Sequence, residues 1–170
     1  MTLLLADFGG RPAVLAPLYD QFDKPVALHG RYLHHTRGQN KMLTIGSGGG
    51  VIHALDGWWV EPLILVEGLF DALSLAVCGW PAVATIGRWA PWLPEVVSGR
   101  VVWLAFDAGR PGEADVAAYV ARLHQAEVRR LPPPPRCKEG CGSVAIGERK
   151  PDRLGQCRPV WSVCTQPEPG

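Results

Sequence analysis

The chain has 170 residues, of which 47% are apolar and 19% charged, and its formal net charge is +1. Length and composition suit one globular domain with or without appendages, and the nearly neutral charge excludes a strong overall field for nucleic acid. No apolar run is long enough to span a membrane, and the N-terminus lacks the basic start of a signal peptide. Because only Cys78 precedes the cysteines of the last 34 residues, we expect a reducing, cytoplasmic location.

The first 61 residues predict a small β-rich region. Residues 14–19 and 25–33 are strand-like and are separated by turn-forming residues, which indicates an antiparallel hairpin. The glycine-rich segment 46–50 predicts a flexible loop, because it lacks the Gly-Lys-Ser/Thr ending of a phosphate-binding loop. A short apolar segment follows at 51–55.

Residues 62–131 alternate between strand-like and helix-like segments, which indicates a parallel sheet joined by right-handed crossovers. The predicted strands are 63–66, 82–85, 101–106 and 127–131, and the predicted helices are 69–78 and 112–126. The segment 90–98 is expected to be helical or irregular. Apolar residues at helical spacing mark the buried faces of the first and last helix. These residues are Leu69, Leu73, Ala76 and Val77 in the first, and Val116, Val120 and Leu123 in the last.

The remainder of the chain is different in character. Four prolines at 132–135 predict a stiff break, and residues 136–170 show no sustained periodicity, so we expect a poorly ordered tail. Its cysteines lack the two-residue gap of common zinc sites, which favours free thiols over a zinc site. These cysteines are Cys137, Cys141, Cys157 and Cys164.

Two of the predicted strands end on a carboxylate. Glu67 follows one and Asp107 ends the other, while Asp71 lies one helical turn past Glu67. Open α/β sheets hold their ligands at the carboxyl ends of their strands, and carboxylate oxygens are ligands for Mg²⁺. We therefore expect Glu67 to act as a general acid or base and Asp107 as a metal ligand, with Asp71 in the metal shell or fixing its geometry. Any one of these acids alone is more simply a solvated charge at a helix start.

Three segments together resemble the TOPRIM domain of bacterial-type primases and of primase-like proteins of phages and plasmids. They are 66–73 (VEGLFDAL), 82–87 (AVATIG) and 104–114 (LAFDAGRPGEA). The family's first motif is Glu-Gly with an Asp three residues after the Gly, and its second is Asp-x-Asp followed by a small residue and Gly. The resemblance covers about residues 12–140, including the upstream segments 17–20 and 28–32.

The resemblance implies a compact, Rossmann-like α/β domain with a mainly parallel four-stranded sheet at 62–135. It also implies a β-rich part of the primase core at 1–61 and a tail at 136–170. The implied chemistry is nucleotidyl transfer that depends on Mg²⁺ or Mn²⁺, namely RNA primer synthesis on single-stranded DNA. The implied partners are the template, nucleotides and a replicative helicase, with no membrane. By position, Glu67 is the catalytic acid, Asp107 the first acid of Asp-x-Asp, and Asp71 the acid of the first motif.

Gly109 stands where the family has the second acid of Asp-x-Asp. Because glycine offers no side-chain ligand, its presence is expected to weaken Mg²⁺ binding. Two alternatives to an active primase therefore stay open: a catalytically degenerate TOPRIM module that binds nucleic acid, and a TOPRIM nuclease-like or topoisomerase-like protein. No tyrosine nucleophile region supports strand cleavage by the topoisomerase route.

Several basic and aromatic residues are candidates for contact with nucleic acid. Phosphates attract Arg and Lys, and bases stack on aromatic rings. The candidates are Arg31, Tyr32, Lys41, Arg88 and Arg110. Trp89 and Trp92 are expected to cap the sheet. The histidines are expected to lie exposed in strands and turns rather than bind a metal: His29, His34, His35 and His53.

Overall fold

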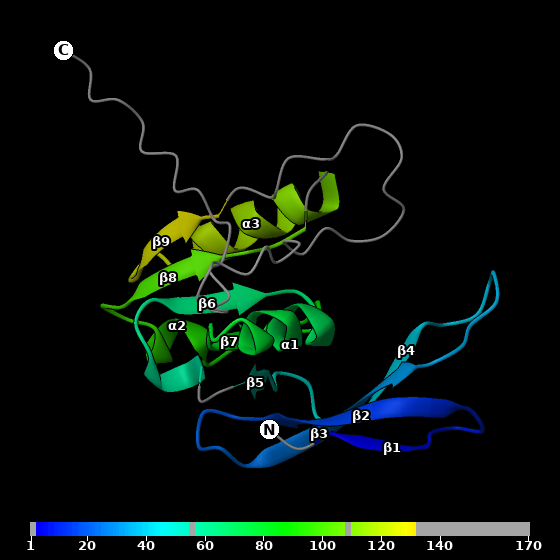
Figure 1. The fold of residues 1–170 in the computed structure, drawn as a ribbon. Helices are drawn as coiled ribbons and strands as arrows, with labels where there is room; N and C mark the ends of the chain where they lie inside the picture. Colours follow the sequence, from blue (N-terminus) through cyan, green and yellow to red (C-terminus); the bar gives the residue numbers. More distant parts are fainter. Residues whose placement is uncertain (1–2, 55–56, 108–109, 132–170) are drawn as a thin grey trace, which may run out of the picture. The chain divides into compact units, whose positions relative to one another are not determined.

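The computed structural model describes residues 3–54, 57–107 and 110–131, which all belong to one compact unit. This unit contains two β-sheets (Figure 1). None of the helices in these residues is long and apolar enough to cross a membrane. The predictions for the tail at 136–170 lie outside the described residues.

The first sheet is an antiparallel meander in which each strand pairs with the next in the chain. Its strands are β1 (Leu4–Asp7), β2 (Pro12–Tyr19), β3 (Pro25–Tyr32) and β4 (Met42–Gly46). The predicted hairpin is confirmed as β2 and β3. Strands β1 and β4 were not predicted, and they form the two edges of this sheet.

The second sheet has five strands in the order β5-β7-β6-β8-β9. The strands are β5 (Ile52–Ala54), β6 (Leu63–Val66), β7 (Ala82–Ala84), β8 (Val101–Leu104) and β9 (Glu127–Arg130). All pairs are parallel except β5 with β7, which is antiparallel. The expectation of four mainly parallel strands therefore misses β5, a three-residue strand too short to show a period.

The helices connect consecutive strands of the second sheet. They are α1 (Leu69–Val77), α2 (Leu93–Val96), α3 (Arg110–Arg122) and a single 3-10 turn, η1 (Gly57–Trp59). Helix α1 ends as predicted, just before Gly79, which has a φ of 79° that favours glycine. The predicted segment 90–98 is helical only at α2. The last helix runs earlier than predicted, and two residues expected on the buried helix faces are exposed: Val77 of α1 and Val120 of α3.

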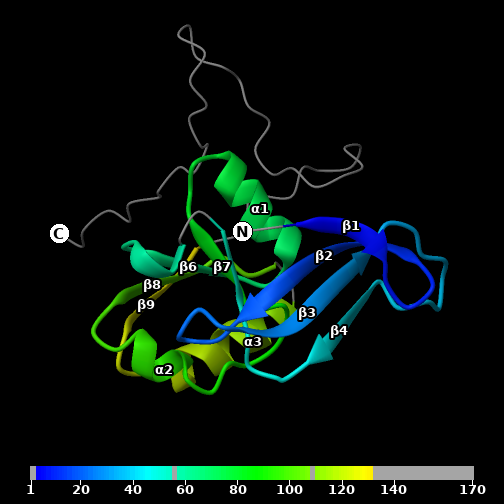
Figure 2. The ribbon, with the colours of Figure 1, turned by 90° about the horizontal axis from the view of Figure 1, so that it is seen from below.

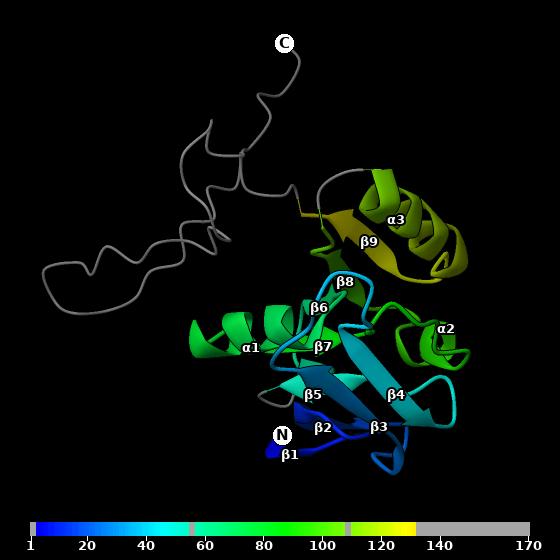
Figure 3. The ribbon, with the colours of Figure 1, turned by 90° about the vertical axis from the view of Figure 1, so that its right-hand side faces the viewer.

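The second sheet is covered on both faces (Figures 2 and 3). On one face, Leu65, Val83 and Leu104 pack against residues of α2 and α3. On the other face, Ile64 and Val66 pack against α1 and against Ala16 and Leu18 of β2. Burial on both faces explains why β6 reads as an unbroken apolar run. The predicted regions 1–61 and 62–135 thus share a hydrophobic core.

The glycine-rich segment before β5 is held in place on both sides. The indole N–H of Trp92 donates a hydrogen bond to the carbonyl of Gly49, at 2.7 Å. A Cβ on Gly50 would lie only 2.7 Å from side-chain carbons of Leu18 and Val26. The close approach of the backbone to β2 and β3 therefore requires glycine at this position. Trp92 also packs against the core, as predicted for a residue that caps the sheet.

Candidate active site

Glu67 and Asp107 meet at the carboxyl edge of the parallel sheet. Strands β6 and β8 are parallel neighbours with Leu65 opposite Leu104, so the residues that follow them emerge side by side. The backbone N–H of Asp107 donates a hydrogen bond to Oε1 of Glu67, at 3.1 Å. The structure thus brings these two sequence-predicted acids together.

Asp71 is held at the same edge by a local hydrogen bond at the start of α1. Its Oδ2 accepts a hydrogen bond from the backbone N–H of Gly68, at 3.0 Å. This contact satisfies a donor that the helix itself leaves unpaired. Asp71 therefore has a structural role as an N-terminal capping partner as well as its place near the other acids.

Burial and neighbouring negative charge raise the pKa of two of these acids, Glu67 and Asp71. Burial raises the pKa of Glu67 most strongly, the negative charges of Asp107, Asp115 and Asp71 add to this, and the N–H of Asp107 opposes it. Burial also raises the pKa of Asp71, with a further contribution from Asp107, while the N–H of Gly68 and the charge of Arg31 lower it. The edge therefore carries negative charge that a cation would stabilise.

Asp115 is a further acid near this edge that the sequence did not single out. It lies three residues after Gly112 in α3, and residues three apart share a helix face. Gly112 packs so closely that a Cβ on it would overlap the carbonyl oxygen of Asp107 and lie 3.3 Å from Oε1 of Glu67. Asp115 could have been predicted from the sequence, because it lies three residues after Gly112, which is part of the second motif segment 104–114.

Two of the predicted basic residues act on the surroundings of the acids. Arg31 lies on the face of the antiparallel sheet that is turned towards the second sheet. Its partner on β2, Val14, is on the same face and packs against the core of the second sheet. The charges of Arg31 and Arg88 both lower the pKa of His29, below the larger effect of burial. Arg31, on β3, also lowers the pKa of Asp71, whereas Arg88 lies in the loop between β7 and α2.

Tyr32, Lys41 and Arg110 lie differently. Tyr32 is 5% exposed on the opposite face of β3 from Arg31, and the guanidinium of Arg11 covers its ring at 3.4 Å. Successive residues of a strand face opposite ways, so Tyr32 points away from Arg31. Because its ring is buried and covered by Arg11, the prediction that Tyr32 stacks on a base does not agree with this packing. Lys41 is exposed just before β4, and Arg110 is exposed at the first position of α3.

The expectation of exposed histidines is wrong for His29. Its side chain is 3% exposed and its Nδ1 lies 2.8 Å from the hydroxyl of Thr44. The expectation also fails for His53, whose side chain is 12% exposed and whose Nε2 lies 2.9 Å from a carboxylate oxygen of Asp23. A strand pattern gives alternation but not which face is covered, and β3 turns His29 towards the second sheet.

The side chains at this edge include carboxylates that can serve as metal ligands. Carboxylate oxygens are suitable donors for Mg²⁺, which is commonly held by one or two carboxylates together with water and substrate phosphates. Within residues 3–54, 57–107 and 110–131, no group of three or more Asp, Glu, His or Cys side chains is arranged to hold a metal ion. The expected set of Glu67, Asp71 and Asp107 is thus not gathered into one metal-binding group, the contact between Glu67 and Asp107 runs through the backbone N–H of Asp107, and Gly109 lies outside the described residues.

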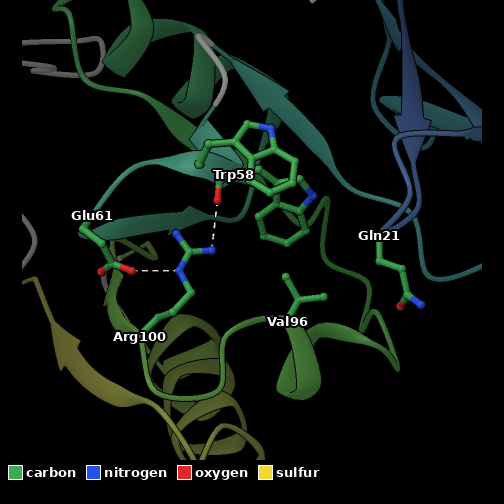
Figure 4. Close-up of a pocket in the computed structure, with 6 residues that line it drawn as sticks. Gln21, Trp58, Glu61, Val96 and Arg100 are labelled. Atoms are coloured by element: carbon green, nitrogen blue, oxygen red, sulfur yellow. Dashed lines mark hydrogen bonds and ion pairs between the residues drawn. The ribbon is translucent and has the colours of Figure 1, made fainter.

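A cavity of about 330 Å³ lies at the opposite edge of the same sheet, before β6 and β8 (Figure 4). It is lined by Gln21, Trp58, Trp59, Glu61, Val96 and Arg100. Arg100 is paired with the carboxylate of Glu61 at 2.8 Å and also bonds to the carbonyls of Trp58 and Val60. The single acid of this cavity is thus neutralised by a structural arginine, unlike the acids at the carboxyl edge.

Solved structures with a similar fold include primase cores. The zinc-binding and RNA polymerase domains of Aquifex aeolicus primase match with a TM-score of 0.57 and 20% identity over 79% of this chain. A DNA primase domain from Pseudomonas aeruginosa matches with a TM-score of 0.55 and 20% identity over 79%. The primase fragment of the bacteriophage T7 primase-helicase matches with a TM-score of 0.53 and 20% identity over 78%.

The chain spans only part of these proteins: 38% of the Aquifex chain, 49% of the Pseudomonas chain and 57% of the T7 chain. No protein-family model matches the sequence, and no curated protein matches it. The similarity therefore establishes a primase-like fold for the residues it covers.

Proposed function

We propose that this chain is a TOPRIM-type part of a DNA primase-like protein that performs nucleotidyl transfer, with RNA primer synthesis on single-stranded DNA as the reaction. The observation that carries the proposal is the contact between the strand-end residues Glu67 and Asp107 in a primase-like fold. Among the proteins of similar fold, primase domains of bacteriophage T7 were solved bound to an RNA/DNA hybrid and dTTP. Single-stranded DNA and nucleotides are the corresponding proposed partners here, with a replicative helicase as a further one.

Glu67 and Asp107 would hold the proposed Mg²⁺ or Mn²⁺, with Asp71 nearby. When bound, such an ion neutralises phosphate charge and supports displacement at phosphorus. Oε1 of Glu67 accepts the N–H of Asp107, and the Glu67 carboxylate would take the proton of an attacking 3′-hydroxyl as that oxygen forms its bond to the α-phosphorus and pyrophosphate leaves. Arg31 and Arg88 would contact phosphates of the template or nucleotide.

A catalytically degenerate module is the second candidate, and one observation favours it. Gly109 supplies no carboxylate where the resemblance calls for one. Such a module would keep the basic residues and the fold, and would bind nucleic acid without turnover.

Primer synthesis on single-stranded DNA separates these candidates. With Mg²⁺ or Mn²⁺ we expect the parent chain to extend labelled ribonucleotides into primers, and Asp107→Asn to lose both primer synthesis and metal binding. Gly109→Asp is expected to increase metal affinity. If the parent makes no primers even with Mn²⁺ but Gly109→Asp does, the chain is the degenerate module. Cleavage of the labelled DNA in place of primer formation would identify the nuclease-like alternative.

A further inference from the structure

Arg130 is a charged residue on the covered face of strand β9. It is the register partner of Leu104, at the end of the neighbouring strand β8. Residues two apart in a strand share a face, so Arg130 lies on the same side as Val128, which packs against the core formed with α2 and α3. The side chain of Arg130 is only 20% exposed. A charged side chain in such a position needs partners that offset its loss of water.

The guanidinium of Arg130 finds these partners around the end of β8. Its Nη1 donates hydrogen bonds to the backbone carbonyls of Leu104 and Leu131, at 3.2 and 2.8 Å. Its Nη2 donates to the carbonyl of Asp107 at 3.3 Å and to Oε1 of Glu113 at 3.0 Å. Four of the five N–H donors of the guanidinium are therefore engaged. The planar fork of arginine suits such a set of acceptors, whereas the lysine ammonium carries its three donors on a single nitrogen.

The bond to Asp107 restrains a residue of the acidic edge from a second side. The N–H of Asp107 donates to Oε1 of Glu67 at 3.1 Å, and its carbonyl accepts from Arg130. The N–H and the carbonyl belong to the two peptide planes that flank one Cα, so the two bonds together restrict the backbone dihedrals of Asp107. Asp107 lies beyond the last residue pair of β8 and β9. A side chain thus takes over where the ladder of backbone hydrogen bonds ends.

The bond to Glu113 fixes the helix that lies against the same carbonyl. Glu113 is in the first turn of α3, and a Cβ on the adjacent Gly112 would overlap the carbonyl oxygen of Asp107. Arg130 therefore binds both this carbonyl and the helix start that packs on it. Because Glu113 offsets the charge of the guanidinium, Arg130 restrains Asp107 without adding an unpaired cation beside the acids.

We propose that Arg130 is the positioning residue that holds Asp107 at its contact with Glu67. Its part in primer synthesis rests on the proposed function, whereas the placement of Asp107 is measurable without turnover. Two variants test the role: Arg130→Met removes all four hydrogen bonds, and Arg130→Lys keeps the charge and part of the donors. Arg129→Met is the matched control, because Arg129 is the neighbouring arginine of β9 and its side chain is 63% exposed.

Hydrogen exchange followed by NMR on the full chain tests the placement. The amide of Asp107 is the one that donates to Glu67, and we expect it to exchange about tenfold faster in Arg130→Met than in Arg129→Met. The amides of β6 and β7 report global opening and are the reference within each variant. Arg130→Lys should give an intermediate rate, and it replaces Arg130→Met if a thermal transition shows that the methionine variant does not fold. Exchange at Asp107 that matches the control, or that changes only in step with the reference amides, would overturn the proposal.

Primer synthesis gives a second readout. Misplacement of a reacting group lowers turnover more than substrate binding, so kcat should fall by about 100-fold in Arg130→Met while KM for ribonucleotides stays near the parent value. A purely structural role would lower the amount of folded protein and leave kcat per folded molecule unchanged, and that result would overturn the proposal. If the parent makes no primers, the proposed function fails, and the exchange rate at Asp107 alone decides the role of Arg130.

Discussion

Single residues fix the geometry of the acidic edge, and Gly112 is the clearest of them. It allows the first turn of α3 to lie against the backbone of Asp107 and the carboxylate of Glu67. The same closeness places Asp115 where its charge reaches Glu67. The arrangement of the acids thus depends on a residue that has no side chain to contribute.

Gly112→Ala is expected to destabilise the protein by about 1–3 kcal/mol, because the added methyl group must displace well-packed backbone. It should also weaken metal binding, since Glu67 and Asp107 would separate. Gly48→Ala is the control, because a Cβ there meets nothing within 4 Å. Thermal or denaturant unfolding measures the first effect. An alanine variant as stable as the parent would show that the helix end moves freely.

His29 gives a prediction about pH. Burial and the charges of Arg31 and Arg88 hold its pKa below 6.5 in the folded chain, whereas the unfolded chain takes up the proton near that value. Unfolding therefore binds a proton just below pH 6.5, and His29 makes the folded state less stable as the pH falls through this window.

We expect His29→Gln to lose this part of the pH dependence while keeping a polar partner for Thr44. The measurement is the melting temperature of both proteins between about pH 7.5 and about pH 5.5. The raised pKa values of Glu67 and Asp71 have the opposite effect, since they make the folded state more stable as the pH falls. Both proteins share this effect. Identical pH profiles for parent and variant would contradict the assignment to His29.

At the scale of elements, short connections are secured by side chains that reach across the sheet. Arg100, just before β8, bonds to Glu61 at 2.8 Å and to the carbonyls of Trp58 and Val60 at 2.9 and 2.8 Å. These contacts join η1 and the start of β6 to β8 (Figure 4). Elements too short to be stable alone thereby gain a fixed position.

Arg100→Met should lower the free energy of unfolding by about 1–3 kcal/mol, because it leaves two partly buried carbonyls without their donor. Arg129→Met is the matched control, since Arg129 pairs with Glu127 on the exposed strand β9. Exposed pairs of this kind contribute about 0–1 kcal/mol. Urea unfolding of the two variants compares them directly, and equal effects would contradict the role given to Arg100.

The sequence predicted best the elements that have a clear apolar pattern or a residue that marks their end. Helix α1 has both an apolar face and Gly79 after it, and β6 is an unbroken apolar run. Strands β1 and β5 escaped prediction for different reasons. The first is apolar on both faces, and the second has only three residues.

At the scale of the whole molecule, the sequence predicted which acids meet but not what surrounds them. Glu67 and Asp107 could be placed together because both follow parallel strands. The burial of His29 could not be predicted, because it depends on how the antiparallel sheet packs over the second sheet. Asp115 was missed because its position depends on where α3 begins, and helix boundaries are poorly marked in sequence.

The aromatic rings behind the acidic edge form a chain of contacts. Trp89 packs edge-on against Tyr119 with ring centroids 5.1 Å apart, and Tyr119 packs against Phe106 at 4.9 Å. Phe106 immediately precedes Asp107, and Tyr119 lies one helical turn after Asp115. Rigidly coupled rings of this kind give strong near-ultraviolet circular dichroism. The protein therefore carries an optical probe whose signal follows any shift of α3 against the acids, with no label and no assay of turnover.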